Sequence, residues 1–277
     1  MKNTLLKLLS LTFLFSLIYS PMLAIDISDT RLLSEPTISK NHIAFIYAED
    51  LWVANKDGSN PRRLTVDEGV ESNPIFSPDG SMIAFNAQYD GNTDVYIVPV
   101  TGGIPMRLTW HPYNDYVRGF SPNGLQVLFN SQRNIFTNRY AQLFTVEIAN
   151  GKVTPLDIPN AFWASYSPDG NQIAYTPIAD RFNQWKHYRG GTASRIWIYD
   201  LKNHAVTEIP KPVGGSNDTQ PIWIDKTVYF ISDRNGEFNL FSYAQISKEI
   251  KQLTDFKDFP IINISASKEE IIFEQAG

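Results

Sequence analysis

A turn followed by a strand recurs along the whole chain, and this repeat limits the folds that the chain can adopt. Three copies are close to one another: "FSPDGSMIAF" at 76–85, "FSPNGLQVLF" at 120–129 and "YSPDGNQIAY" at 166–175. An aromatic residue closes each copy and recurs at intervals of 40 to 55 residues. Including three weaker copies, these aromatic residues are Phe45, Phe85, Phe129, Tyr175, Phe230 and Phe273. A period of this length indicates a repeat architecture.

Each repeat contains the patterns of four short strands. Pro and Gly in "SPDG" suit a tight turn, and the Asp side chain can cap that turn. The segments around the turn, such as "DVYIVPV" from Asp94, alternate in polarity and are rich in β-branched and aromatic residues, which indicates strands. A β-sandwich would not repeat the same turn in every unit, whereas propeller blades do. We therefore predict an all-β fold, a six-bladed β-propeller of four-stranded antiparallel blades.

The predicted propeller occupies residues 25–277, with blades that start near residues 35, 73, 117, 161, 219 and 259. The sixth blade has only two strand patterns, "FPIINIS" and "EEIIFEQ", so we expect it to be incomplete and the chain to continue in a longer protein. Residues 25–33 could add one strand. Alternation along the first strands makes Asn73, Val117 and Gln220 candidates to face a central channel.

The first 24 residues have the layout of a secretory signal peptide. Lys2 and Lys7 come before an apolar core at 8–19, and the small residue Ala24 follows. We predict that residues 1–24 are a signal peptide and that the protein is exported to the periplasm. The alternative is an uncleaved signal that anchors the protein in a membrane.

Composition and motifs argue against several classes of function. A net charge of −5 disfavours nucleic-acid binding, and the absence of cysteine excludes thiolate chemistry. The run "GGSND" at 214–218 lacks the second glycine of a serine-nucleophile elbow, and no arrangement of partners supports any of the four histidines as a base. "DGNTD" at 90–94 lacks the bidentate glutamate of a calcium loop. We expect no catalytic residue, metal site or cofactor in this chain.

The fourth repeat contains a long insertion between its second and third strands, at 177–194. Insertions in propeller blades lie on one face, where they are free to bind. Four residues are candidates: Trp185, Lys186, Tyr188 and Arg189. In one interpretation Trp185 and Tyr188 pack the loop onto the propeller, and Arg189 bonds backbone carbonyls. In the other, the cations receive an acidic peptide or the carboxylates of a neighbouring subunit.

The same insertion carries a specific resemblance. "WKHYRGGT" at 185–192 resembles a Trp-Lys-x-Tyr-Arg-Gly-Gly-Thr run in the fourth blade of the first propeller of the tricorn protease family. "EPTISKNHIAFIYAEDLWVAN" at 35–55 is similar to the first blade of that propeller, and the "SPDG" turns also resemble TolB repeats. The resemblance extends from about Ser34 to the end of the chain.

Tricorn-like proteins are large serine peptidases that degrade oligopeptides, with a six-bladed propeller ahead of a seven-bladed propeller, a PDZ-like domain and a catalytic core. The resemblance implies that this chain is the amino-terminal propeller and forms a shell or channel around a core that it does not contain. The implied partners are peptides, the remaining domains of the same polypeptide and further copies in a homo-oligomer. The alternatives are a freestanding TolB-like periplasmic protein-binding propeller, or the propeller of a prolyl-oligopeptidase relative.

Overall fold

The computed structural model describes residues 32–135, 137 and 139–276. The predicted signal peptide and most of the segment 25–33 lie outside these residues. Within the described ranges, no helix has the length and apolar character needed to cross a membrane.

The strands of the first three blades follow the repeats in the sequence. Blade 1 consists of β1 (Ser34–Ile38), β2 (His42–Tyr47), β3 (Asp50–Asn55) and β4 (Arg62–Arg63). Blade 2 consists of β5 (Glu71–Phe76), β6 (Met82–Ala87), β7 (Asp94–Pro99) and β8 (Met106–Arg107). Blade 3 consists of β9 (Asp115–Phe120), β10 (Gln126–Ser131), β11 (Gln142–Glu147) and β12 (Val153–Pro155).

The later blades are built in the same way, except that two strands make up the last. Blade 4 consists of β13 (Ala164–Tyr166), β14 (Gln172–Tyr175), β15 (Trp197–Asp200) and β16 (Val206–Glu208). Blade 5 consists of β17 (Asp218–Ile224), β18 (Thr227–Ser232), β19 (Asn239–Ala244) and β20 (Ile250–Gln252). Blade 6 consists of β21 (Ile261–Ala266) and β22 (Ile271–Gln275).

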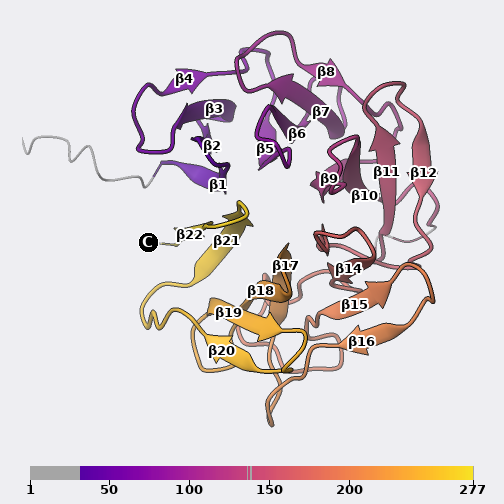
Figure 1. Ribbon diagram of the computed structural model, residues 1–277, viewed down its shortest axis with the longest axis vertical. Helices are drawn as coiled ribbons and strands as arrows, with labels where there is room; N and C mark the ends of the chain where they lie inside the picture. Colours follow the sequence, from indigo (N-terminus) through magenta and orange to yellow (C-terminus); the bar gives the residue numbers. More distant parts are fainter. Residues whose placement is uncertain (1–31, 136, 138, 277) are drawn as a thin grey trace, which may run out of the picture. The chain divides into compact units, whose positions relative to one another are not determined.

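The blades are arranged in a ring with the first strand of each blade innermost (Figure 1). Neighbouring innermost strands contact one another in chain order from β1 to β21, and β21 and β22 in turn contact β1. All pairings within the blades are antiparallel, and each strand pairs with the next one in the sequence. The predicted fold, a six-bladed propeller with an incomplete sixth blade, is confirmed for the described residues.

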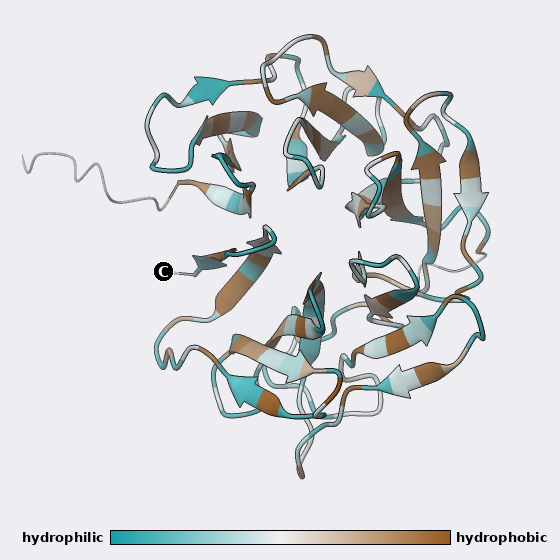
Figure 2. Cartoon of the chain, in the orientation of Figure 1, coloured by the Kyte–Doolittle hydropathy of each residue, from teal (hydrophilic) through white to brown (hydrophobic). Residues whose placement is uncertain are grey.

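Aromatic pairs between the second and third strands form much of the core. The closing aromatic of the repeat stands directly opposite an aromatic of the next strand, as Phe129 does opposite Phe144 and Phe230 opposite Phe241. All four side chains are buried, and the ring centroids of the two pairs are 5.5 and 6.1 Å apart. Figure 2 shows apolar bands interrupted by polar ones along β11 and β15. The middle residues of both strands are buried without alternation, because a blade packs against a neighbour on each face: Leu143 contributes to one core and the adjacent Phe144 to another.

The Ser-Pro-Asp-Gly turns are held by their own side chains. Asp79 Oδ1 accepts hydrogen bonds from Ser77 Oγ at 2.6 Å and from the Ser81 amide at 3.0 Å, and these bonds lower the pKa of Asp79 to about 2. Gly80 has φ of 73°, a conformation that glycine adopts without strain. The turn therefore uses a side-chain acceptor and a glycine, and Asn123 supplies the acceptor in blade 3.

Candidate functional site: the central channel and the blade-four insertion

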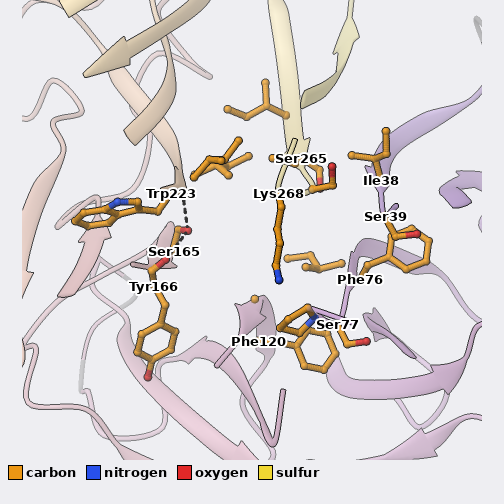
Figure 3. Close-up of a pocket in the computed structure, with 18 of the residues that line it drawn as sticks. Ile38, Ser39, Phe76, Ser77, Phe120, Ser165, Tyr166, Trp223, Ser265 and Lys268 are labelled. Carbon is orange, nitrogen blue, oxygen red and sulfur yellow. Dashed lines mark hydrogen bonds between the residues drawn. The ribbon is translucent and has the colours of Figure 1, made fainter. Parts of the chain in front are cut away.

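The innermost strands surround a cavity of about 980 Å³. Hydroxyl groups of Ser39, Ser77 and Ser165 lie at its wall together with apolar side chains, and Lys268 extends into it from the turn between β21 and β22 (Figure 3). The wall therefore combines polar hydrogen-bonding groups with apolar surface, as ligand-binding cavities commonly do.

A β-bulge interrupts the innermost strand in blades 1, 2, 3, 5 and 6. Glu35, Asn73 and Gln220 lie at three of these bulges, with φ of 50°, 53° and 49°. A bulge changes the direction of the side chains beside it, so simple alternation no longer predicts which residues face the channel. Asn73 and Gln220 line the cavity as predicted.

Val117 was also predicted to face the channel, but its side chain lies elsewhere. It lies on the cavity wall, but its side chain is buried in the core formed between blades 2 and 3. The bulge in β9 pairs Leu128 with Gly119 and Phe129 with Val117, which leaves Arg118 unpaired between them. Arg118 is thus the polar side chain that blade 3 contributes to the channel.

Side chains at the bulges connect neighbouring blades. Asn73 Nδ2 donates to the Val117 carbonyl, which joins blades 2 and 3, and the Asn73 amide donates to the Glu35 carboxylate of blade 1. Gln220 Nε2 donates to the Ile262 carbonyl of blade 6 at 2.7 Å. These bonds satisfy backbone groups that the bulges release from the strand ladders.

Blades 4 and 5, and blades 6 and 1, are connected by other residues. The Trp223 amide donates to Ser165 Oγ at 3.0 Å, as drawn in Figure 3. Glu274 Oε2 accepts from the Glu35 amide at 2.9 Å and from Asn263 Nδ2 at 2.8 Å. Burial and the nearby Glu274 carboxylate raise the pKa of Glu35. Between blades 1 and 6, side-chain hydrogen bonds therefore supplement the strand contacts.

Arg118 lies against an aromatic ring on the channel wall. Its guanidinium carbon is 4.3 Å from the centroid of the Trp163 ring, within the range of a cation–π interaction. The Trp163 Nε1 atom donates to Asp180 Oδ2 at 2.9 Å, which fixes the ring. Burial lowers the pKa of Arg118 to about 10, so the side chain remains a cation at neutral pH.

The blade-four insertion, between β14 and β15, is bound to blade 5. Arg189 Nη1 lies 2.7 Å from Asp233 Oδ2, and His187 Nδ1 lies 3.1 Å from the same oxygen. Lys186 Nζ is 2.6 Å from a carboxylate oxygen of Glu237. Burial would raise the pKa of Asp233, but the hydrogen bonds from Arg189, Asn217 and His187 outweigh it and hold that pKa below its ordinary value.

The four predicted binding residues have different environments. Lys186 and Arg189 pair with carboxylates of this chain, and the Tyr188 carbonyl accepts from Asn217 Nδ2 at 2.9 Å. Trp185 is 61% exposed, so it does not pack against the propeller as one interpretation expected. A binding role for the four residues stays a prediction.

Asp180 connects the insertion to the channel wall. It accepts from Ser194 Oγ at 2.7 Å and Thr219 Oγ1 at 2.8 Å, in addition to Trp163 Nε1. Lys211 Nζ donates to the Ser194 carbonyl at 2.6 Å and so holds the far end of the insertion. The ring that supports Arg118 is therefore positioned by the insertion.

Sequence reasoning missed Glu35, Arg118 and Trp163 as residues of the channel. One signal was available, because a polar residue stands before proline at the same place in three repeats: Glu35-Pro36, Asn73-Pro74 and Gln220-Pro221. This dipeptide marks the bulge. Arg118 precedes glycine instead, and no pattern indicated that Trp163 would lie beneath it.

The fold and the site define a class: a six-bladed β-propeller whose innermost strands enclose an open cavity. Residues 30–277 match the family described as the tricorn protease N-terminal beta propeller domain, and the chain belongs to this family. Tricorn protease homolog 1 of Streptomyces coelicolor is 27% identical over 242 residues, which are 85% of this chain and 22% of that protein. The tricorn protease of Thermoplasma acidophilum is 25% identical over 256 residues, 89% of this chain and 23% of the relative.

Solved structures share the fold of this chain. The crystal structure of the tricorn protease superposes with a TM-score of 0.78 at 24% identity, over 88% of this chain and 24% of the other. A putative TolB from Agrobacterium tumefaciens has the same fold, with a TM-score of 0.66 at 19% identity over 82% of each chain. The chain thus spans less than a quarter of the tricorn relatives, and the predicted family is confirmed.

Proposed function

We propose that this chain is the amino-terminal propeller of a tricorn-like serine peptidase that degrades oligopeptides. The family match over residues 30–277 carries the proposal, and the cavity of about 980 Å³ inside the ring supports it. Polar groups on the wall can hydrogen-bond to an extended peptide, while the apolar surface accepts its side chains. In this role the propeller forms a shell or channel around a catalytic core that other domains supply.

The proposed partners are peptides, the other domains of the same polypeptide, and further copies of the protein in a homo-oligomer. The signal-peptide layout of residues 1–24 supports export to the periplasm, where short peptides would be the substrates.

The test uses the complete gene product and a thiol placed in the channel. These 277 residues contain no cysteine, so Lys268→Cys adds one thiol to the propeller, at a side chain that extends into the cavity, and the unsubstituted product treated with the same maleimide gives the background from the other domains. Modification with a bulky maleimide should slow the hydrolysis of fluorogenic peptides several-fold. Lys152→Cys is the matched control, because Lys152 is exposed and does not line the cavity. A complete product that hydrolyses no peptide, or equal effects of the two labels, would contradict the proposal.

A freestanding TolB-like protein-binding propeller is the second candidate. The putative TolB from Agrobacterium tumefaciens favours it, because the likeness covers 82% of both chains. The same assay separates the two functions, since a TolB-like binding protein would show no peptidase turnover in any form of the gene product.

A further inference from the structure

Arg118 is a cation on the channel wall that stacks on Trp163 but has no acidic partner within ion-pair distance in the described part of the chain. Among the described residues, none forms an ion pair or hydrogen bond with its guanidinium group, and its Nε atom is buried. A buried charge is costly unless it is paired, so an unpaired guanidinium beside a cavity marks a place where a ligand can supply the missing charge. The side chains of Arg133 and Arg234 are 12% and 7% exposed, but each forms an ion pair with a buried aspartate.

The two carboxylates near Arg118 are occupied by other donors. Asp180 accepts from Trp163, Ser194 and Thr219, and Glu35 accepts from the Asn73 amide. Both lie close enough to act on Arg118 through their charge, yet neither lies within ion-pair distance. The N–H groups of the Arg118 guanidinium can therefore still donate hydrogen bonds to a ligand.

The position of Trp163 determines which part of Arg118 is available. Its ring covers one face of the guanidinium group at 4.3 Å, and the hydrogen bond to Asp180 holds the ring in place. Stacking leaves the N–H donors at the edge of the guanidinium plane free, and that edge matches the two oxygens of a carboxylate. The stack also orders the side chain before a ligand arrives, which lowers the entropy cost of binding.

We propose that Arg118 and Trp163 form a carboxylate-binding site on the wall of the channel, and that its ligand is a carboxylate group of a peptide. The inference rests on the proposed function, because that function places peptides in the channel. A singly charged carboxylate fits better than phosphate, since Glu35 and Asp180 would repel a second negative charge. Burial and Glu274 raise the pKa of Glu35, which weakens this repulsion toward lower pH.

Isothermal titration calorimetry of the chain with three acetylated tripeptides tests the site. The probes are Ala-Ala-Ala with a free carboxylate, its C-terminal amide, and the amide of Ala-Asp-Ala. The free carboxylate should bind about tenfold more tightly than the Ala-Ala-Ala amide, the difference expected for a charge-assisted hydrogen bond. Tighter binding of the Ala-Asp-Ala amide would assign the site to acidic side chains, and weaker binding would assign it to C-termini.

Arg118→Gln should abolish the preference for a carboxylate. Lys268→Gln is the matched control, because it removes another positive charge from the same cavity and should preserve the preference. If Arg118→Gln does not fold, Arg118→Lys replaces it, and this variant should show a reduced preference because lysine cannot form the two-pronged contact. Thermal melts establish that each variant is folded.

Three results would overturn the site: equal binding of acid and amide, a preference that survives in Arg118→Gln, or no binding of any probe. The proposed function is judged separately, from turnover by the complete gene product. If hydrolysis depends on an open channel but binding shows no carboxylate preference, the proposed function stands and only the carboxylate site at Arg118 is rejected.

Discussion

At the scale of single residues, the blades differ in the acidic residue that begins the innermost strand and in the partner of that residue. Buried aspartates begin β9 and β17, and each pairs with an arginine that follows the second strand of its blade. In blade 2 the acid is Glu71 and its partner is the Tyr89 hydroxyl. Tyrosine brings no positive charge, so burial raises the pKa of Glu71 to about 7.

Glu71→Gln should remove part of the pH dependence of stability. The ordinary pKa of Glu71 is 4.5, and the folded state holds its proton more tightly than the unfolded chain does. The resulting stabilisation is full below pH 4.5 and is lost as the pH rises through about 7, in total about 3 kcal/mol. Urea unfolding between pH 4.5 and 8 should show this loss in the native chain and in the control Glu49→Gln, which changes an exposed acid. An equal loss in Glu71→Gln would contradict the assignment.

At the scale of elements, the insertion of blade 4 is a loop held by the neighbouring blade. Its cations reach Asp233 and Glu237 on the turn between β18 and β19. Asp180 bonds it to the residue just before β13 of blade 4 and to β17 of blade 5. These polar contacts lie outside the apolar blade cores, against which the insertion places only Phe182 among its large apolar side chains in the described residues. Loss of the loop contacts should therefore affect the order of the insertion before it affects the propeller.

Arg189→Ala should increase cleavage of the insertion in limited proteolysis and lower the free energy of unfolding by about 1–3 kcal/mol, because Asp233 loses a charged partner. Trp185→Ala is the companion variant in the same loop. Its side chain is 61% exposed, so its effect should stay within about 0.5 kcal/mol. Denaturant titration measures both values. A loss above about 3 kcal/mol for Arg189→Ala, the scale of a core truncation, would show that the loop is part of the buried structure.

At the scale of the whole molecule, the ring has one weak place. β22 pairs with β21 alone among the described residues, and β22 is only partly buried, whereas the corresponding strand of blade 5, β18, is largely buried. An unpaired strand edge offers hydrogen-bonding groups to other chains, and closure of a propeller normally protects it.

A chain extended by about 25 residues, enough for two strands and a turn that pair with β22, should melt at a higher temperature and aggregate less. Light scattering and thermal melts at equal concentration compare the two chains. The expectation fails if the 277-residue chain is monomeric and melts as high as the extended one.

The 277-residue chain by itself should have no peptidase activity, because its sequence offers no supported nucleophile and base. Purified protein is incubated with fluorogenic peptides and with a serine-reactive probe. Labelling of one serine, with turnover that disappears when that serine is mutated, would prove the expectation wrong.

The sequence by itself determined the architecture of this protein. Period-two patterns, the "SPDG" turns and the recurring aromatics depend only on local chemistry, and they predicted the propeller, its six repeats and the short last blade. The "WKHYRGGT" run likewise indicated the family because it is a contiguous motif.

Tertiary structure decided which side chains these elements bring together. Alternation placed Val117 in the channel, but a bulge buries its side chain between blades and leaves Arg118 on the wall. Asp233 lies 44 residues beyond Arg189, the residue of the insertion that it binds. Contacts between blades, and those made at the bulges, join residues from different repeats. A local pattern does not encode them, because the strand pattern of one repeat is independent of the side chains on the neighbouring blade.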